Sequence, residues 1–211
     1  FGEDQLMMAS ATKEFVEKEL DPHREQFEKK DYQLTEDCMK KAGELGLLGI
    51  SVPAEYGGMG MPFNTSVLIC DKISGANGSF STAFGAHTGI GTLPILLYGD
   101  DAQRKKYLPK LATGEWMGCY CLTEPGAGSD ANSGKTKAVL TKDGKHYLIT
   151  GQKMWISNAG FADVFIVFAR IEDDKNITGF ILEKGMEGIT MGEEEYKLGL
   201  NSSSTRQVFF N

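Results

Sequence analysis

Basic residues are scarce in this chain of 211 residues, and so are long apolar runs. There are 22 Lys and Arg against 29 Asp and Glu, and the formal net charge is −7. A general nucleic-acid surface needs basic patches, so we expect no nucleic-acid partner. No apolar run reaches the roughly 18 residues of a membrane span. The sequence begins at Phe1 without a basic, apolar leader, so we expect no signal peptide in it.

Cysteine is also rare. The four cysteines form no CxxC pair and no His/Cys cluster with metal-ligand spacing. They are Cys38, Cys70, Cys119 and Cys121. We expect buried free thiols, because unpaired cysteine is among the most frequently buried residues. A reducing, intracellular compartment follows from that expectation.

Apolar residues are plentiful, at 41% of the chain, and the first half carries them at helical spacing. The pattern predicts a helix over 5–20, stopped by Asp21-Pro22, and a second helix started by Thr35-Glu36-Asp37. Further helices are expected from Asn64, from Ser79, and over 101–111. The stretch 83–91 is helical in pattern but rich in small residues.

After Met117 the pattern changes to short β runs separated by Gly and Asp-Gly turns. The runs cover 147–150, 164–169, 178–182 and 207–210. The sequence therefore predicts an α+β chain. We expect a helical domain over 1–113 and a β domain over 114–211.

Two short segments carry the strongest functional signal. Residues 120–130 read Tyr-Cys-Leu-Thr-Glu-Pro-Gly-Ala-Gly-Ser-Asp: strand character, then a sharp turn. Successive free N–H groups in such a turn form a concave anion site suited to phosphate. This is not the dinucleotide Gly-x-Gly-x-x-Gly pattern, because residue 131 is Ala and no helix period follows. The second segment, 151–158, places the Trp155 ring beside the Ser157 hydroxyl.

The two segments together resemble the signature of the acyl-CoA dehydrogenase family. Residues 52–60, Val-Pro-Ala-Glu-Tyr-Gly-Gly-Met-Gly, and 107–111, Tyr-Leu-Pro-Lys-Leu, are similar to other parts of that family. The resemblance implies an all-α N-terminal domain followed by a small antiparallel β-barrel domain. It also implies a C-terminal helical bundle that is absent from these residues. We therefore expect the chain to be truncated after Asn211.

The resemblance implies FAD as cofactor. The expected FAD-binding residues are Tyr120, Cys121, Leu122, Thr123, Glu124, Gly126, Gly128, Ser129, Trp155, Ile156 and Ser157. By resemblance, Leu122 and Thr123 bond the pyrimidine edge of the flavin, and Ser129 bonds the diphosphate near the thioester ligand. Ser157 then lies near N5 and O4, where many family members have Thr, and Trp155 packs against the ring.

No catalytic residue is assigned within this chain. Glu124 is a candidate base, but a turn carboxylate that bonds local N–H groups is the reading we favour. The resemblance places the base that takes the α-proton in the C-terminal domain. We therefore expect the 211 residues alone to be inactive.

Glycines at positions 85, 89 and 91 interrupt a helical stretch. Each costs about 1 kcal/mol relative to Ala, so either close helix packing or a ligand should require them. The resemblance places this stretch at the floor of the acyl pocket, with Gly85, Gly89 and Ser129 as substrate-binding residues, and is strongest to very-long-chain members. His87 is expected to be packed rather than catalytic. Arg104–Lys106 is expected to be a solvated face, with a coenzyme A contact as the weaker reading.

The implied activity is α,β-dehydrogenation of acyl-CoA thioesters in fatty-acid β-oxidation. Electrons would pass to an electron-transfer flavoprotein. We expect a homodimer or homotetramer at full length, in the bacterial cytoplasm or the mitochondrial matrix. An acyl-CoA oxidase, a flavin monooxygenase on the same scaffold and a non-catalytic assembly partner remain as alternatives.

Overall fold

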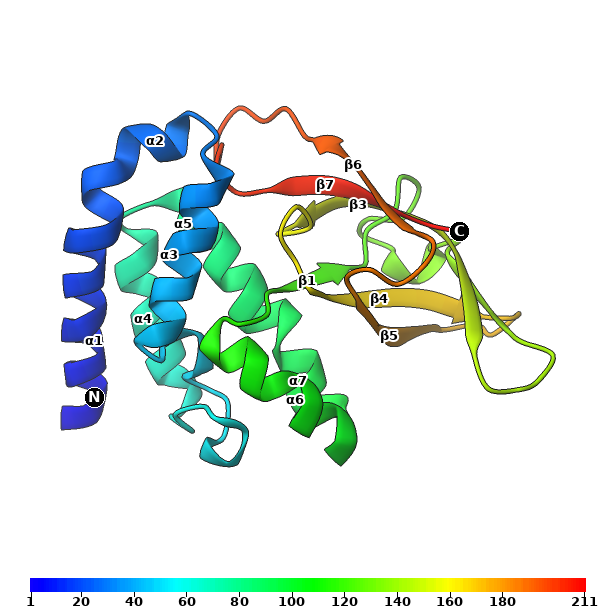
Figure 1. Cartoon of the computed structure of the whole chain (residues 1–211), viewed down its shortest axis with the longest axis horizontal. Helices are drawn as coiled ribbons and strands as arrows, with labels where there is room; N and C mark the ends of the chain where they lie inside the picture. Colours follow the sequence, from blue (N-terminus) through cyan, green and yellow to red (C-terminus); the bar gives the residue numbers. More distant parts are fainter. The chain divides into compact units, whose positions relative to one another are not determined.

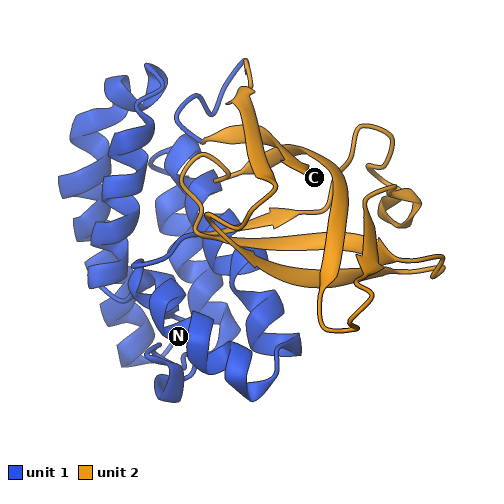
Figure 2. Cartoon of the chain, turned by 45° about the vertical axis from the view of Figure 1, so that its right-hand side comes forward, with its two compact units in different colours: residues 1–117, 197–203 blue, residues 118–196, 204–211 orange.

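The computed structural model describes all 211 residues, and they divide into two compact units (Figure 2). The helical unit comprises residues 1–117 and 197–203, and the sheet unit comprises 118–196 and 204–211. A helical part followed by a β part is what the sequence predicts, and this order is confirmed. The structure moves the boundary from 113/114 to 117/118 and assigns 197–203 to the helical unit. None of the helices is both long and apolar enough to cross a membrane.

The helical unit contains seven α-helices, coloured blue to green in Figure 1. Their bounds are α1 Glu3–Phe15, α2 Arg24–Glu28, α3 Tyr32–Glu44, α4 Phe63–Ser74, α5 Gly78–Gly85, α6 Leu93–Tyr98 and α7 Asp101–Thr113. Two π-helical turns, Val16–Leu20 and Ala86–Gly91, extend α1 and α5. Phe80 of α5 is fully buried, and its ring lies 5.7 Å from that of Phe15 and 6.5 Å from that of Phe27, between centroids.

Helix α3 begins three residues before the predicted start. Its N-cap is Asp31, whose carboxylate accepts the Leu34 N–H at 3.0 Å. Thr35 has a different task, because its hydroxyl is buried and donates to the Ser202 carbonyl at 2.8 Å. A capping residue and a tertiary anchor look alike in sequence, and this similarity is why the predicted start was wrong.

Ser202 fixes the segment 197–203 to the helical unit. Its N–H donates to the Ser79 hydroxyl at 3.3 Å, and its own hydroxyl donates to the Phe27 carbonyl. Ser202 is fully buried, so these bonds satisfy groups that water cannot reach. The domain prediction missed this return because hydroxyl-to-backbone bonds leave no periodic pattern.

The sheet unit contains seven strands in one mixed sheet. They are β1 Gly118–Cys121, β2 Lys137–Leu140, β3 Tyr147–Ser157, β4 Val164–Ile171, β5 Ile177–Glu183, β6 Ile189–Glu194 and β7 Thr205–Phe210. The order is β1-β4-β2-β3-β7-β6, with β5 also paired to β4. The predicted β runs are confirmed, but the antiparallel barrel is corrected, because β1 and β2 both pair with β4 in parallel and the sheet does not close.

The long connection between β1 and β2 lets these two strands run in the same direction, although they pair with β4 and not with each other. A two-residue hairpin joins only antiparallel strands, whereas parallel strands need a crossover of about a dozen residues or more. Residues 122–136 provide that length between β1 and β2. Both strands therefore run in the same direction along one edge of β4: Gly118 lies beside Val164, and Lys137 lies beside Arg170.

Strand β3 changes partner at Gly151. Its first half pairs with β2, and from Gly151 onward it pairs with β7. Gly151 has φ +154°, and a Cβ there would fall 2.5 Å from the Thr136 Oγ1 atom, so glycine is required. The core beneath is formed by buried side chains of Cys119, Cys121, Ile156, Ala159, Ala162, Phe165, Val167, Val208 and Phe210.

Candidate functional site

The connection between β1 and β2 carries the first motif, and we call residues 122–136 the motif loop. It leaves the sheet after Cys121 and re-enters at Lys137 on the same edge of β4. The loop therefore projects from the sheet between two fixed ends. Its sequence up to Ser129 matches the segment in which we predicted cofactor contacts.

Glu124 closes the base of the motif loop. Its carboxylate accepts the N–H of Lys135 at 2.5 Å and the N–H of Thr136 at 3.1 Å. The Lys153 ammonium, from β3, lies 2.7 Å from the same carboxylate and also donates to the Leu122 carbonyl at 3.1 Å. Both ends of the loop are thus joined through one carboxylate. The interpretation of Glu124 as a turn carboxylate agrees with this geometry.

The Glu124–Lys153 pair is buried, with 7% and 2% of the two side chains exposed. Burial raises the pKa of Glu124, but the Lys153 ammonium and the N–H groups of Lys135 and Thr136 outweigh it, so the pKa lies below its usual value. Burial lowers the pKa of Lys153, and Glu124 opposes that shift. Glu124 is therefore held as an anion whose oxygens already accept hydrogen bonds from within the chain.

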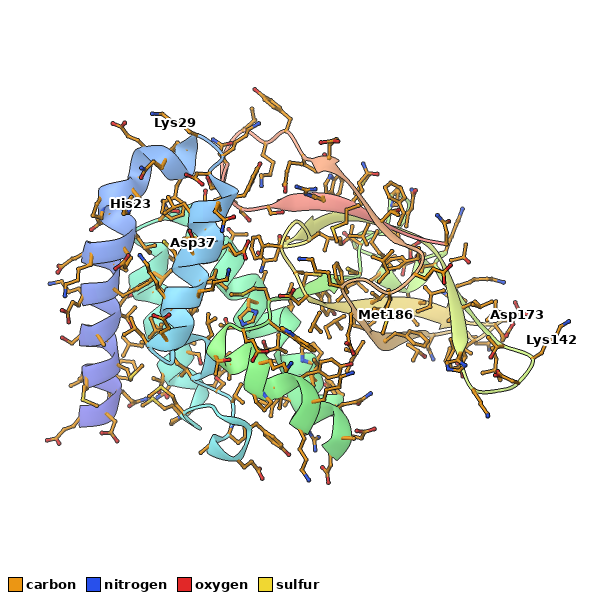
Figure 3. The ribbon with its side chains drawn as sticks, viewed as in Figure 1. His23, Lys29, Asp37, Lys142, Asp173 and Met186 are labelled. Carbon is orange, nitrogen blue, oxygen red and sulfur yellow. The ribbon has the colours of Figure 1, made fainter.

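The far end of the motif loop is held by Asn132. Its amide oxygen accepts the Ile177 N–H at 3.2 Å, and its Nδ2 donates to the Lys175 carbonyl at 3.0 Å. The Arg170 guanidinium bonds the carbonyls of Asn132 and Asp174. These contacts join the loop to the β4–β5 turn, at whose tip Figure 3 shows Asp173.

Between these two anchors the loop presents an open tip at 125–130. The Glu124 and Ala127 backbones exchange hydrogen bonds, but the N–H groups of Gly126, Gly128 and Ser129 donate to no acceptor in the chain. A Cβ on Gly126 or Gly128 would meet nothing within 4 Å, and neither residue has a positive φ. Packing within the chain therefore does not require glycine there. Open N–H groups and free space above them suit an anion such as a diphosphate.

Trp155 stands out from the sheet at a β-bulge. Lys153 pairs with Val208 and Ile156 pairs with Arg206, so two residues of β3 oppose one of β7. Trp155 has φ +58°, a left-handed conformation that costs a non-glycine residue roughly 1–2 kcal/mol. Its side chain is 61% exposed. A strained residue with an exposed aromatic ring is typical of a ligand contact.

The two motif segments are directly connected. The Met154 N–H donates to the Thr123 carbonyl at 2.9 Å, which places the bulge of β3 beside the start of the motif loop. Ser157, half-buried, follows in β3. Asn158 follows the strand with φ +67°, and its Nδ2 donates to the Gly118 carbonyl at 3.4 Å. The two segments in which we expect cofactor contacts therefore lie beside each other.

The remaining predicted cofactor residues differ in exposure. Leu122 and Thr123 are half-buried, and Ser129 is exposed. Cys121 and Ile156 are buried in the sheet core, so only their backbone atoms could reach a ligand. The half-buried Tyr120 packs its ring 4.9 Å from that of Phe168, between centroids. The individual roles assigned to these residues stay predictions.

The helical unit contains its own cavity, of about 250 Å³. No charged side chain lines it, and its walls include Phe84, Leu93, Gly85 and Gly89. A Cβ on Gly85 or Gly89 would meet nothing within 4 Å. Helix packing therefore does not require these glycines, and their role as substrate-binding residues stays a prediction. Gly89 lies in the π-helical turn Ala86–Gly91, a feature frequent at functional sites.

His87 and Arg104 serve the fold. His87 is fully buried, its Nε2 bonds the Leu111 carbonyl at 2.9 Å, and burial lowers its pKa to about 4. Arg104 donates to the Leu96 carbonyl at 3.0 Å and pairs with Asp101 at 3.5 Å. The packed reading of His87 agrees with this geometry. Arg104, whose side chain is 28% exposed, departs from the expected solvated face, whereas Lys105 and Lys106 are exposed.

Sequence reasoning missed the residues that hold the motif segments in place. Lys153 lies within the second motif segment, but its sequence context indicates no role for it, and no local pattern singles out Glu194, Ser204 or Arg206. The one available signal was the position of Lys153, two residues from Gly151 in a strand whose alternation directs it inward. The other three residues are brought together by the pairing of β6 with β7.

Comparison with known proteins agrees with this geometry. Residues 2–115 match the N-terminal domain of acyl-CoA dehydrogenases, and 119–211 match the middle domain. The chain is 48% identical over 211 residues to a probable acyl-CoA dehydrogenase of Bacillus subtilis, covering all of this chain and 35% of that protein. It is 46% identical over 177 residues to the human mitochondrial very long-chain specific acyl-CoA dehydrogenase, covering 80% of this chain and 27% of that protein.

A solved structure is also similar. An acyl-CoA dehydrogenase from Bacillus anthracis, complexed with FAD, superposes with a TM-score of 0.95 at 47% identity. The match covers all of this chain and 36% of that one. This chain thus spans about a third of the length of these two Bacillus proteins. Two domain matches in the expected order, together with the geometry of both motif segments, establish that the chain belongs to the acyl-CoA dehydrogenase family.

Proposed function

We propose that this chain forms the flavin-binding and acyl-binding part of an FAD-dependent acyl-CoA dehydrogenase. The whole protein would remove a proton from Cα and a hydride from Cβ of an acyl-CoA thioester, leaving a trans-2-enoyl-CoA. The observation that carries the proposal is the open tip of the motif loop beside the turned-out Trp155. Neither feature is explained by packing within the chain.

The residues present are suited to FAD. The free N–H groups at Gly126, Gly128 and Ser129 would bind the diphosphate, and the exposed face of Trp155 would pack against the ring system. When bound, FAD supplies the acceptor for the hydride. The chain supplies donors near the ring, at Leu122, Thr123 and Ser157. Because Glu124 and Lys153 fix the loop in advance, these donors need no reorganisation during the reaction.

We assign the acyl chain to the cavity lined by Gly85 and Gly89. Each buried methylene contributes about 0.8 kcal/mol, so a deep apolar cavity rewards a long chain. The absence of charged side chains on its walls supports an unfunctionalised hydrocarbon. We propose long acyl-CoA thioesters as substrates and an electron-transfer flavoprotein as the oxidant of the reduced cofactor.

Flavin titration tests the first half of the proposal. Purified residues 1–211 would be titrated with FAD, following the quenching of Trp155 fluorescence in a Trp116→Phe background. Weak, saturable binding is expected, because only part of the cofactor would contact this chain. The Ser129→Ala and Gly128→Val variants should weaken it further. Wild-type affinity in both variants would contradict the assignment of the loop tip.

Turnover tests the second half. Residues 1–211 alone should not oxidise palmitoyl-CoA with a dye acceptor, because Glu124 is occupied as an anion. The enzyme from which these residues derive should do so. Fast reoxidation of its reduced flavin by oxygen would instead favour an acyl-CoA oxidase. Bound flavin without any turnover would favour a non-catalytic family member.

A further inference from the structure

Strand β7 is flanked by two bulges at the same level. On one side Met154 and Trp155 of β3 oppose Gln207. On the other side β6 pairs Met191 with Val208 and Glu194 with Arg206, so two of its residues also oppose Gln207. A bulge on both neighbours at one position bends the sheet locally and directs Trp155 outward.

Glu194, which ends the second bulge, accepts three hydrogen bonds. Its Oε1 accepts from the Arg206 Nε at 2.6 Å and from the Ser204 hydroxyl at 2.7 Å. Its Oε2 accepts from the Thr205 N–H at 2.8 Å. The Glu194 and Arg206 side chains are 17% and 31% exposed. One carboxylate therefore holds Ser204 and the first two residues of β7.

Ser204 connects the Glu194 carboxylate to the turn that follows β3. Its hydroxyl oxygen accepts the Gly160 N–H at 3.0 Å, and its carbonyl accepts the Asn158 N–H at 2.9 Å. The approach is close: a Cβ on Gly160 would fall 2.5 Å from the Ser204 Oγ and 2.8 Å from Glu194 Oε1. The turn after Ser157 is thereby held against the beginning of β7.

We propose that Glu194, acting through Ser204 and Arg206, is the positioning residue that fixes the register of β3 at Trp155 and Ser157. Without Glu194, β3 can shift by one residue along β7, and this shift would relieve the left-handed backbone conformation of Trp155. A one-residue slip moves every side chain to the opposite face of the sheet. The Trp155 ring and the Ser157 hydroxyl would then leave the surface proposed for the flavin. This inference deepens the proposed function and rests on it only for the identity of the ligand.

The test uses Trp155 as its own reporter. The chain has two tryptophans, so a Trp116→Phe background leaves only the indole of interest. In that background we would compare Glu194→Gln and Ser204→Ala with Glu172→Gln. Glu172 is the matched control, because its carboxylate also accepts a backbone N–H, that of Leu140 at 3.0 Å, but contacts neither motif segment. The readouts are Trp155 anisotropy, iodide quenching and FAD affinity, with circular dichroism as the check on folding.

Glu194→Gln and Ser204→Ala are expected to lower Trp155 anisotropy and to change its quenching at unchanged secondary structure. FAD affinity should fall roughly tenfold, the loss expected for a hydrogen bond to a charged group. Glu172→Gln should match the parent. Parental Trp155 anisotropy and quenching in both test variants would overturn the inference. If Glu194→Gln unfolds the chain, Ser204→Ala decides, because it removes only one hydroxyl.

The two proposals fail in different ways. A parent chain that binds no FAD, with a Trp155 that still responds to Glu194→Gln, would contradict the flavin assignment and support the positioning role. A parent that binds FAD, with a Trp155 and an affinity indifferent to both variants, would contradict the positioning role alone.

Discussion

The Lys153 ammonium lies 2.7 Å from the Glu124 carboxylate, and both side chains are buried. The same ammonium bonds the Leu122 carbonyl, and the same carboxylate bonds the N–H groups of Lys135 and Thr136. An ion pair in the interior is weak evidence for net stability. Here its consequence is geometric, because it joins β3 to both ends of the motif loop.

Removing one partner of this pair should be costly. Lys153→Met leaves the Glu124 anion buried without its cation, and we expect a loss of about 3–5 kcal/mol in the free energy of unfolding at neutral pH. Urea denaturation followed by circular dichroism measures it. Lys137→Met is the control, because Lys137 forms only an exposed pair with Asp173. Equal losses in the two variants would mean that burial of the Glu124–Lys153 pair has no special effect.

Acid should remove the contribution of the Glu124–Lys153 pair to folding stability. The pKa of Glu124 in the folded chain lies below its value in the unfolded chain, which is about 4.3. Its contribution is therefore fully present above that value and is lost as pH falls through the folded pKa. Glu124→Gln should remove this part of the acid dependence while lowering stability at pH ~7. Parallel pH–stability curves for parent and variant below pH ~4 would contradict the shift.

His87 should make stability depend on pH in a different window. Burial lowers its folded pKa to about 4, against an ordinary value near 6.5. The unfolded chain therefore binds the proton first, and stability falls as pH drops from 6.5 toward 4, by about 3 kcal/mol in all. His87→Gln should abolish this slope and keep a donor for the Leu111 carbonyl. A His87→Gln variant that keeps the parental slope would show that His87 is not its source.

We expect substrate turnover, but not folding, to depend on the absence of a side chain at Gly85. Gly85→Ala places a methyl group where nothing lies within 4 Å, so we expect about 0.5–1 kcal/mol of stabilisation from helix propensity. Gly85→Leu should fill the cavity and, in the active enzyme, depress turnover of palmitoyl-CoA far more than of butyryl-CoA. Thermal melts and the ratio of the two rates are the measurements. A destabilising Gly85→Ala would show that the glycine serves packing after all.

Trp155 should be replaceable at a gain in stability. Its side chain is 61% exposed, so truncation loses little burial, and its φ of +58° suits glycine. Trp155→Gly should therefore be neutral or stabilising by about 1 kcal/mol, and FAD affinity should fall. The melting temperature and an FAD titration, followed by flavin fluorescence, report the two effects. A clear loss of stability would mean that the ring packs within this chain.

The sequence alone determined the fold class and the two motif segments. Helical spacing in the first half, short β runs in the second, and Pro125, Gly126 and Gly128 at a turn are all local patterns. It also identified Glu124 as a turn carboxylate, because a carboxylate beside free N–H groups is stabilised by them.

The tertiary structure decided what depends on distant residues. The parallel entry of β2, the ion pair of Lys153 with Glu124, and the arrangement of Glu194, Ser204 and Arg206 all depend on strand register. Register is set by pairing across the sheet, where one residue of shift exchanges the two faces. Thr35 illustrates the same limit, since only the return of Ser202 makes its hydroxyl an anchor instead of a cap. A single sequence carries no local record of such contacts, because each is completed by a partner far along the chain.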